Sequence, residues 1–224
     1  MVIKKGLDIL LSVPKTLWFN LCYLPVHQAV KLPIWIHYGT AITINKGGTI
    51  IIPNACVCTA MIHIGFHRVE ICEPRAKTIL SISGGVLCFL GSAHIGHGSK
   101  IHVSHGAKLI LGDNFSISAS SAINCYKSIR FGKDVQFSWD CLVMDSDTHK
   151  IYDDEGNVTN EAKEIVVGDK VWIGCRATIL KGAVIPNNCV IGSCSLVSGN
   201  KYEPDSVIVG VPAKSIKKIG GWKL

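Results

Sequence analysis

Apolar and small residues recur every six positions between Ile165 and Asn200. Large aliphatic residues form one column, Val167, Ile173, Ile179, Ile185, Ile191 and Val197, and small residues form a second column four places later, Ala177, Ala183, Cys189 and Ser195. Helices place apolar residues three and four apart and amphipathic strands place them two apart, so neither explains a period of six. This period is typical of a parallel β-helix, in which short strands joined by corners stack their coils and so bury the inward side chains.

Short apolar segments extend the pattern toward the N-terminus with a looser period. They are separated by glycines and comprise residues 42–44, 49–52, 77–82, 86–91, 100–103 and 107–112. From Leu111 the six-residue period tightens and, with a slip of two near Ile129, continues to Val143. We therefore predict an all-β chain with a β-helix over residues 39–205.

The segment of residues 1–38 is different, because it mixes Leu, Trp and Phe with Lys in short pieces broken by proline. We predict a partly helical cap, since the open end of a coil leaves apolar side chains and strand backbone unpaired. The alternative is contact with a membrane surface through Trp18, Phe19 and the lysines. The prolines interrupt the segment before about 18 apolar residues accumulate, and no cleavable signal is convincing. We expect a cytoplasmic protein, and the alternative is a peripheral protein attached to the inner face of the membrane.

Two further segments depart from the repeat. Residues 145–164 are polar and charged. A connection of this length between strands of a compact domain often carries functional residues. We predict a protruding loop there. Residues 206–224 are expected to form a C-terminal tail with a short helix.

Composition narrows the function classes. The 224 residues are 48% apolar and 17% charged, which is typical of a well-packed globular chain. The net charge of +7 suits an anionic cofactor or a sugar substrate, and its concentration at the two ends makes a nucleic-acid partner unexpected. The ten cysteines include Cys189 and Cys194, which lie in the repeat at positions that favour small core residues. We therefore interpret the cysteines as reduced, buried thiols that fill space in the core.

Three motifs accompany the hexads in a fixed order. DSDTH at Asp145–His149 opens the loop, VWIG at Val171–Gly174 marks the return to the coil, and VGVPAK at Val209–Lys214 closes it. In these features residues 108–219 resemble the hexapeptide-repeat acyltransferases, which include maltose, galactoside and virginiamycin O-acetyltransferases and sugar O-acetyltransferases of surface polysaccharide synthesis. The resemblance implies a left-handed coil and a homotrimer, with sites in the grooves between neighbouring coils and the loop of one subunit reaching over the site.

Transfer of an acetyl group from a thioester to an alcohol requires a base, because an alcohol is a poor nucleophile near neutral pH. Histidine matches this task, and the resemblance assigns it to His149, with direct attack on the thioester. Either Asp145 or Asp147 is expected to orient the imidazole. The candidate acceptor-binding residues are Ser120, Asn124 and Trp139. Galactoside-type enzymes often have proline after the histidine, whereas this chain has Lys150, so a free sugar, a lipid-linked glycan, an antibiotic and an amine all stay open as acceptors.

The resemblance also implies acetyl-CoA as the acyl donor, held along the outside of the final coils. The residues expected beside its pantetheine arm are Trp172, Gly174, Ser193 and Gly199. Its phosphates need cations, for which Lys201, Lys214, Lys217 and Lys218 are the candidates. The alternative for Trp172 is an aromatic residue that stabilises the subunit interface.

Two alternatives to acetyl transfer remain. A zinc hydratase of carbonic anhydrase type would bind its metal through three imidazoles, and the candidate histidines are His94, His97, His102 and His105. Their spacing distributes them over different faces, so no metal is expected. The other alternative is a noncatalytic β-helix assembly protein. The favoured hypothesis is an acetyl-CoA-dependent O-acetyltransferase that acts on a sugar or glycan hydroxyl.

Overall fold

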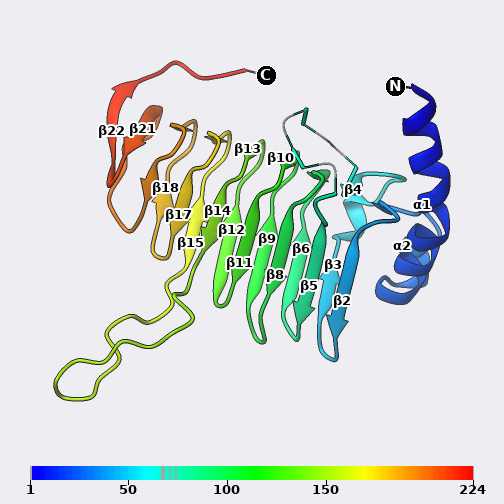
Figure 1. The fold of residues 1–224 in the computed structure, drawn as a ribbon, viewed down its shortest axis with the longest axis horizontal. Helices are drawn as coiled ribbons and strands as arrows, with labels where there is room; N and C mark the ends of the chain where they lie inside the picture. The colour runs from blue at the N-terminus through cyan, green and yellow to red at the C-terminus, as the bar shows by residue number, and fades with distance from the viewer. Residues whose placement is uncertain (1, 67–68, 71, 74, 224) are drawn as a thin grey trace.

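The computed structural model describes residues 2–66, 69–70, 72–73 and 75–223, and its main body is a left-handed parallel β-helix (Figure 1). Three sheets form its sides, and from β1 to β17 each strand pairs in parallel with the strand three places later in the chain. This pairing joins equivalent positions of successive coils. The predicted fold class is therefore confirmed.

Up to β20, each sheet takes every third strand. Sheet A contains β1 (Ile34–Ile36), β4 (Ile62–Ile64), β7 (Ala93–Ile95), β10 (Phe115–Ala119), β13 (Gln136–Trp139), β16 (Trp172–Ile173), β19 (Val190–Ile191), β21 (Ser206–Gly210) and β22 (Ala213–Lys218). Sheet B contains β2 (Ala41–Asn45), β5 (Ile79–Ser83), β8 (Lys100–Val103), β11 (Ala122–Cys125), β14 (Leu142–Met144), β17 (Thr178–Leu180) and β20 (Leu196–Val197). Sheet C contains β3 (Thr49–Ile51), β6 (Val86–Phe89), β9 (Lys108–Leu111), β12 (Ser128–Phe131), β15 (Ile165–Val167) and β18 (Val184–Ile185).

The core runs along the axis of the coil and consists of the columns that the hexads predict. Every member of the aliphatic column from Val167 to Val197 and of the small column from Ala177 to Ser195 is buried. In the middle coils the space is filled by Phe115, Phe131 and Phe137, whose ring centroids lie 5.1 to 5.6 Å apart. Stacking of flat coils explains this burial, since a single coil has no opposite layer against which to pack.

The N-terminal segment is one long helix, α1 (Val2–Tyr23), followed by the short α2 (Val26–Ala29). The expectation of short pieces broken by proline is wrong, because α1 continues through Pro14. Proline removes one hydrogen bond of the helix, but Pro14 lies on the exposed side, where water can satisfy the carbonyl that is freed. The coil also begins earlier than predicted, since β1 already pairs with β4.

Helix α1 covers the open edge of β1 with polar side chains. Ser12 Oγ accepts from the Tyr38 amide at 3.0 Å, and Thr16 Oγ1 accepts from the Ile36 amide at 3.1 Å. Asn20 completes the series, because it donates to the Ile34 carbonyl at 2.7 Å and accepts from the Ile34 amide at 3.2 Å. These helical residues are four positions apart, a rise of about 6 Å, and their backbone partners are two positions apart, a rise of about 6.6 Å. Because the two distances nearly match, each polar side chain of the helix reaches its own backbone partner.

The C-terminus forms a hairpin in place of the expected short helix, which is a correction to the prediction. Strand β21 continues sheet A beside β19, and β22 pairs with β21 in antiparallel fashion. The alternation of Ser206, Ile208 and Gly210 with Val207 and Val209 suits a strand, and Ile208 extends the buried core by one more coil. Among the described residues, no helix has the length and hydropathy of a membrane span.

Candidate functional site

The protruding loop of residues 145–164 lies between the end of β14 and the start of β15, at the corner from sheet B to sheet C. It projects well away from the coil (Figure 1). Tyr152 and Val158 form an antiparallel bridge near its tip. The loop is therefore an ordered ribbon whose two ends are held by neighbouring strands.

Asp145 anchors the start of this loop in the core. Its carboxylate is fully buried and accepts hydrogen bonds from the backbone amides of Tyr126, Lys127 and Ser128 at 2.7 to 2.8 Å. Cys125 Sγ lies 3.8 Å from the same carboxylate, which contributes, after burial, to a thiol pKa raised to about 12. Both oxygens of Asp145 are thus committed to the turn after β11.

Asp147 belongs to a second network, at the surface. Its Oδ2 pairs with the Lys181 ammonium and accepts from Asn160 Nδ2 at 2.8 Å. The hydrogen bond from Lys181, followed by that from Asn160, lowers the pKa of Asp147 below its ordinary value of 3.8. Lys181 also donates to the Asn160 carbonyl at 2.8 Å, so three side chains tie the loop to the coil.

His149 is exposed at the end of this network. Its amide donates to the Asp147 carbonyl at 2.8 Å, and its own carbonyl accepts from Asn160 Nδ2 at 2.8 Å. Between them, Thr148 has a φ of 64°, which tightens the turn. The backbone of His149 is therefore fixed while its imidazole faces outward.

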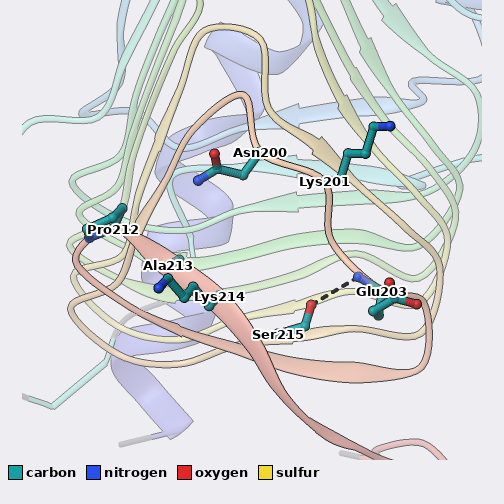
Figure 2. A pocket seen from close by; sticks show the side chains of 7 residues that line it. All are labelled: Asn200, Lys201, Glu203, Pro212, Ala213, Lys214 and Ser215. Carbon is teal, nitrogen blue, oxygen red and sulfur yellow. Dashed lines mark hydrogen bonds between the residues drawn. The ribbon is translucent and has the colours of Figure 1, made fainter.

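Two of the predicted donor-binding lysines line one hollow beside the C-terminal hairpin. Lys201 and Lys214 line a hollow of about 520 Å³ (Figure 2), together with Asn200, Glu203, Pro212, Ala213 and Ser215. Ser215 Oγ accepts from the Glu203 amide at 2.9 Å and holds one wall. An ammonium group suits a phosphate, but the Lys201 side chain points away from Lys214 (Figure 2), and the Glu203 carboxylate repels an anion. Lys217 and Lys218 lie on β22 outside this lining, and Lys218 Nζ is 4.0 Å from Glu203 Oε2.

The other predicted donor-binding residues lie in different settings. Ser193 and Gly199 are exposed at corners of the last coils. Gly174 is buried, its amide donates to the Ile191 carbonyl at 2.8 Å, and an added Cβ would lie 2.7 Å from that oxygen. Packing thus explains this glycine, and its amide is not available to a pantetheine arm within this chain.

Trp172 lies exposed on sheet A, where its Nε1 donates to Ser138 Oγ at 3.2 Å. The C-terminal tail returns to it, since the Trp172 and Trp222 ring centroids are 6.3 Å apart. Trp222 Nε1 donates to the Lys170 carbonyl at 2.9 Å. The two rings border a hollow of about 230 Å³ that also includes Ser118 and Gln136.

The candidate acceptor-binding residues do not converge within one chain. Ser120 occupies the corner between sheets A and B with a φ of 50°, and Trp139 lies beside Ala119, the neighbour of Ser120. Asn124 lies further along sheet B, between His102 and Met144. Asn124 is therefore the one near the base of the protruding loop.

The histidines weighed as metal ligands are dispersed. His94 stacks on His63 in sheet A at 4.9 Å, His97 is buried at a corner, and His102 Nδ1 lies 3.1 Å from Ser81 Oγ in sheet B. His105 lies against Gly84 at the next corner. Burial, and then the neighbouring His94, lower the pKa of His63. Within the described part of the chain, no group of three metal-binding side chains gathers.

Sequence reasoning missed Asn160, Lys181 and Trp222. Lys181 falls in the regular hexads and Asn160 in a polar loop, so neither stands out in the sequence, and they meet Asp147 only through the fold. Trp222 follows two glycines at the end of the chain. An aromatic residue in a polar tail was the one available signal.

Comparison with known proteins agrees with this architecture. Residues 164–199 match the family model for the bacterial transferase hexapeptide (six repeats). WbbJ of Escherichia coli K12, described as a lipopolysaccharide biosynthesis O-acetyl transferase, is 30% identical over 132 residues, which cover 55% of this chain and 67% of WbbJ. A Mycobacterium tuberculosis protein described as a probable acetyltransferase is 33% identical over 131 residues, 55% of this chain, and the match spans only 41% of that relative.

The fold has a close counterpart among solved structures. The crystal structure of NeuO, a polySia-specific acetyltransferase, superimposes with a TM-score of 0.58 at 20% identity and covers 83% of this chain and 89% of NeuO. At this identity the likeness concerns the fold. The hexads, their buried columns and the match to WbbJ together show that the chain belongs to the hexapeptide-repeat transferase family.

Proposed function

We propose that this protein is an acetyl-CoA-dependent O-acetyltransferase that acts on a hydroxyl group of a sugar or glycan, with His149 as the general base. The observation that carries the proposal is the network of Asp147, Asn160 and Lys181, which fixes the backbone of His149 and leaves its imidazole exposed on the loop. Family membership supports acyl transfer, and the description of WbbJ supports a glycan acceptor.

The chemistry requires one proton transfer to the protein. His149 takes the acceptor's hydroxyl proton as the oxygen attacks the thioester carbonyl, so that an ester C–O bond forms and the C–S bond breaks. The imidazolium then returns the proton to the departing thiolate, which leaves as the free thiol. The Asp147 carboxylate stays ionised through this cycle, because the hydrogen bonds from Lys181 and Asn160 lower its pKa.

Asp147, and not Asp145, is the carboxylate that we assign to the support of His149. Both oxygens of Asp145 already accept backbone amides in the core, whereas Asp147 shares Asn160 with His149. The support acts through the backbone of His149. Asp147 is accordingly a positioning residue.

We place the anionic end of acetyl-CoA at the hollow of Lys201 and Lys214, which lies beside the last coils. The double variant Lys201→Ala/Lys214→Ala should raise the KM for acetyl-CoA about tenfold or more with little change in kcat, because it removes two phosphate partners. Lys217→Ala is the matched control, since Lys217 lies outside the hollow. An equal effect of Lys217→Ala would contradict this placement.

The decisive experiment measures thiol release from acetyl-CoA in the presence of a panel of sugar and glycan acceptors. His149→Ala should lower kcat by about a hundredfold to ten-thousandfold, the range for a positioned general base. The control is His105→Ala, which removes another exposed histidine, at a corner of the coil. Full activity of the His149 variant would refute the proposed base, and thiol release that no acceptor stimulates would refute the proposed reaction.

A further inference from the structure

The orientation of α1 is unusual for a helix at the end of a protein core. Its polar residues Ser12, Thr16 and Asn20 face the protein, because the edge of β1 offers backbone groups to satisfy. Lys15 reaches the same way and donates to the carbonyls of Tyr38 and Thr40 at 2.6 and 2.7 Å. The apolar face of α1 is consequently left to point outward.

We call this outward face the cap stripe. It consists of Leu7, Leu10, Leu11, Leu17, Trp18 and Leu21 on α1, continued by Val26 and Val30 around α2. All are exposed large hydrophobic residues, with 67% of Leu10 and 74% of Val26 accessible. The positions on α1 recur at three- and four-residue intervals, so they form one stripe along the helix. Contiguous apolar stripes of this kind mark interaction surfaces.

The charge of the cap indicates which partner fits. Residues 1–38 contain four lysines and one aspartate, a net formal charge of +3, and of these lysines Lys15 is turned toward the coil. A second copy of the cap would bring two such positive segments together, whereas an anionic lipid surface would neutralise them. Leucine and tryptophan on one face of a lysine-containing helix are also the composition of helices that lie in the membrane interface.

We propose that the cap stripe binds an anionic lipid bilayer, with α1 lying parallel to the membrane plane. The proposal joins the two hypotheses that the sequence left as alternatives, because α1 caps the coil with its polar face and presents its apolar face to lipid. It does not depend on the proposed acetyl transfer.

The geometry of the coil then sets the height of the candidate site. Helix α1 runs along β1 and so lies perpendicular to the axis on which the coils stack (Figure 1). Strand β14, which leads into the loop of His149, lies four strand spacings of sheet B from β2 in the first coil, which is about 19 Å at about 4.8 Å per strand. A site held at that distance suits an acceptor group on a chain tethered to the membrane, at some remove from the lipid headgroups.

The test is co-sedimentation of the full-length protein with vesicles. Vesicles of equal parts phosphatidylcholine and phosphatidylglycerol should bind the protein at least about tenfold more strongly than vesicles of phosphatidylcholine alone. The variant Leu10→Glu/Leu17→Glu/Leu21→Glu should lose that binding by about tenfold or more, because charges replace apolar side chains on the stripe. Equal binding by the wild-type protein and this variant would overturn the proposal.

A matched control changes exposed apolar residues elsewhere. Val211→Glu/Ile216→Glu adds negative charge at the C-terminal hairpin, where both side chains are exposed, and should leave vesicle binding unchanged. Thermal unfolding of all variants checks that they fold. If the wild-type protein ignores both vesicle types and instead forms larger assemblies that the triple variant dissolves, the stripe binds a second copy and the lipid proposal is wrong.

Discussion

At the scale of single residues, the two carboxylates of the DSDTH motif have separate functions although only one residue lies between them. Asp145 faces the core and satisfies three backbone amides, and Asp147 faces solvent and pairs with Lys181. Strand alternation would place residues two apart on the same face, so the bend at Asp145, where β14 has ended, is what separates the two side chains. One carboxylate thus determines where the loop begins, and the other determines how His149 is held.

Asp145→Ala should lower the free energy of unfolding by about 3 to 5 kcal/mol, because three amides near the core lose their acceptor. Denaturant unfolding measures the loss, and Asp145→Asn should be milder because it keeps one acceptor oxygen. Asp154→Ala, in the exposed part of the loop, is the control and should change stability by less than about 0.5 kcal/mol. Unchanged stability together with lost activity would contradict the structural assignment of Asp145.

The lowered pKa of Asp147 predicts a specific dependence on pH. Its ion pair stabilises the loop at every pH above about 4, and this contribution is lost as the pH falls through the folded pKa, below the ordinary 3.8. Carboxyl chemical shifts followed by NMR should give a midpoint below 3.8 in the wild type and a higher one in Lys181→Met. Lys150→Met removes another exposed lysine of the loop and should leave the midpoint in place. A wild-type midpoint at or above 3.8 would disprove the network.

At the scale of elements, α1 replaces a missing neighbour of β1. Parallel coils leave backbone donors and acceptors unpaired at both ends of the stack, and such edges invite pairing with other chains. At the N-terminal end Ser12, Thr16 and Asn20 meet these groups. At the C-terminal end β22 covers β21 by folding back as a hairpin. The protein thus closes its two ends with different elements.

Asn20→Ala should destabilise the protein by about 2 to 3 kcal/mol, since it leaves both backbone groups of Ile34 without their partner in a buried setting. Thermal or denaturant unfolding checks the value. Asn45→Ala removes an exposed asparagine from β2 and serves as the matched control. Equal stability of the two variants would show that α1 does not protect the edge of β1.

At the scale of the whole molecule, the three sides of the coil differ in character. Five outward residues near the loop on sheet B are half-buried and apolar, and they lie beside the polar Asn124 and Thr178: Ala122, Leu142, Met144, Leu180 and Leu196. Sheet C presents the charged Lys108 and Arg130 outward beside Ile110 and Val166, and sheet A presents Ser116 and Gln136 beside the exposed Trp172. Sheet B is therefore the side that we propose for contact between subunits in a homotrimer.

This assignment predicts a particle of about 73 kDa by light scattering, three times the 24.2 kDa chain. Leu142→Glu/Leu196→Glu should reduce the mass toward that of one chain, because it buries charges in the proposed interface. Ile51→Glu on sheet C is the control, and its mass should stay at the trimer value. A monomeric wild type, or a trimer that the sheet C variant disrupts and the sheet B variant does not, would contradict it.

Prediction of strands succeeded where the apolar period spans several consecutive coils and failed for three short strands of the first coils, where that period is absent. Strands β1, β4 and β7 escaped notice because each is a triplet, IWI, IHI or AHI, with a single outward residue between two inward ones. Three residues are too few to establish a period of two or of six. Two other features were missed because tertiary contacts stabilise them. Helix α1 continues through Pro14 while it packs on β1, and the C-terminal hairpin forms where β21 pairs with sheet A.

The sequence by itself determined the β-helix, its buried columns, the position of the protruding loop and the resemblance to hexapeptide-repeat acyltransferases. These features are periodic or contiguous, so spacing along the chain records them. Only the tertiary structure decided that Asp147 and not Asp145 meets Lys181, that Lys201 and Lys214 share a hollow without Lys217, and that α1 turns its polar face inward. The physical reason is that each depends on contact between residues of different coils or elements, and stacking in space, not distance along the chain, selects those partners.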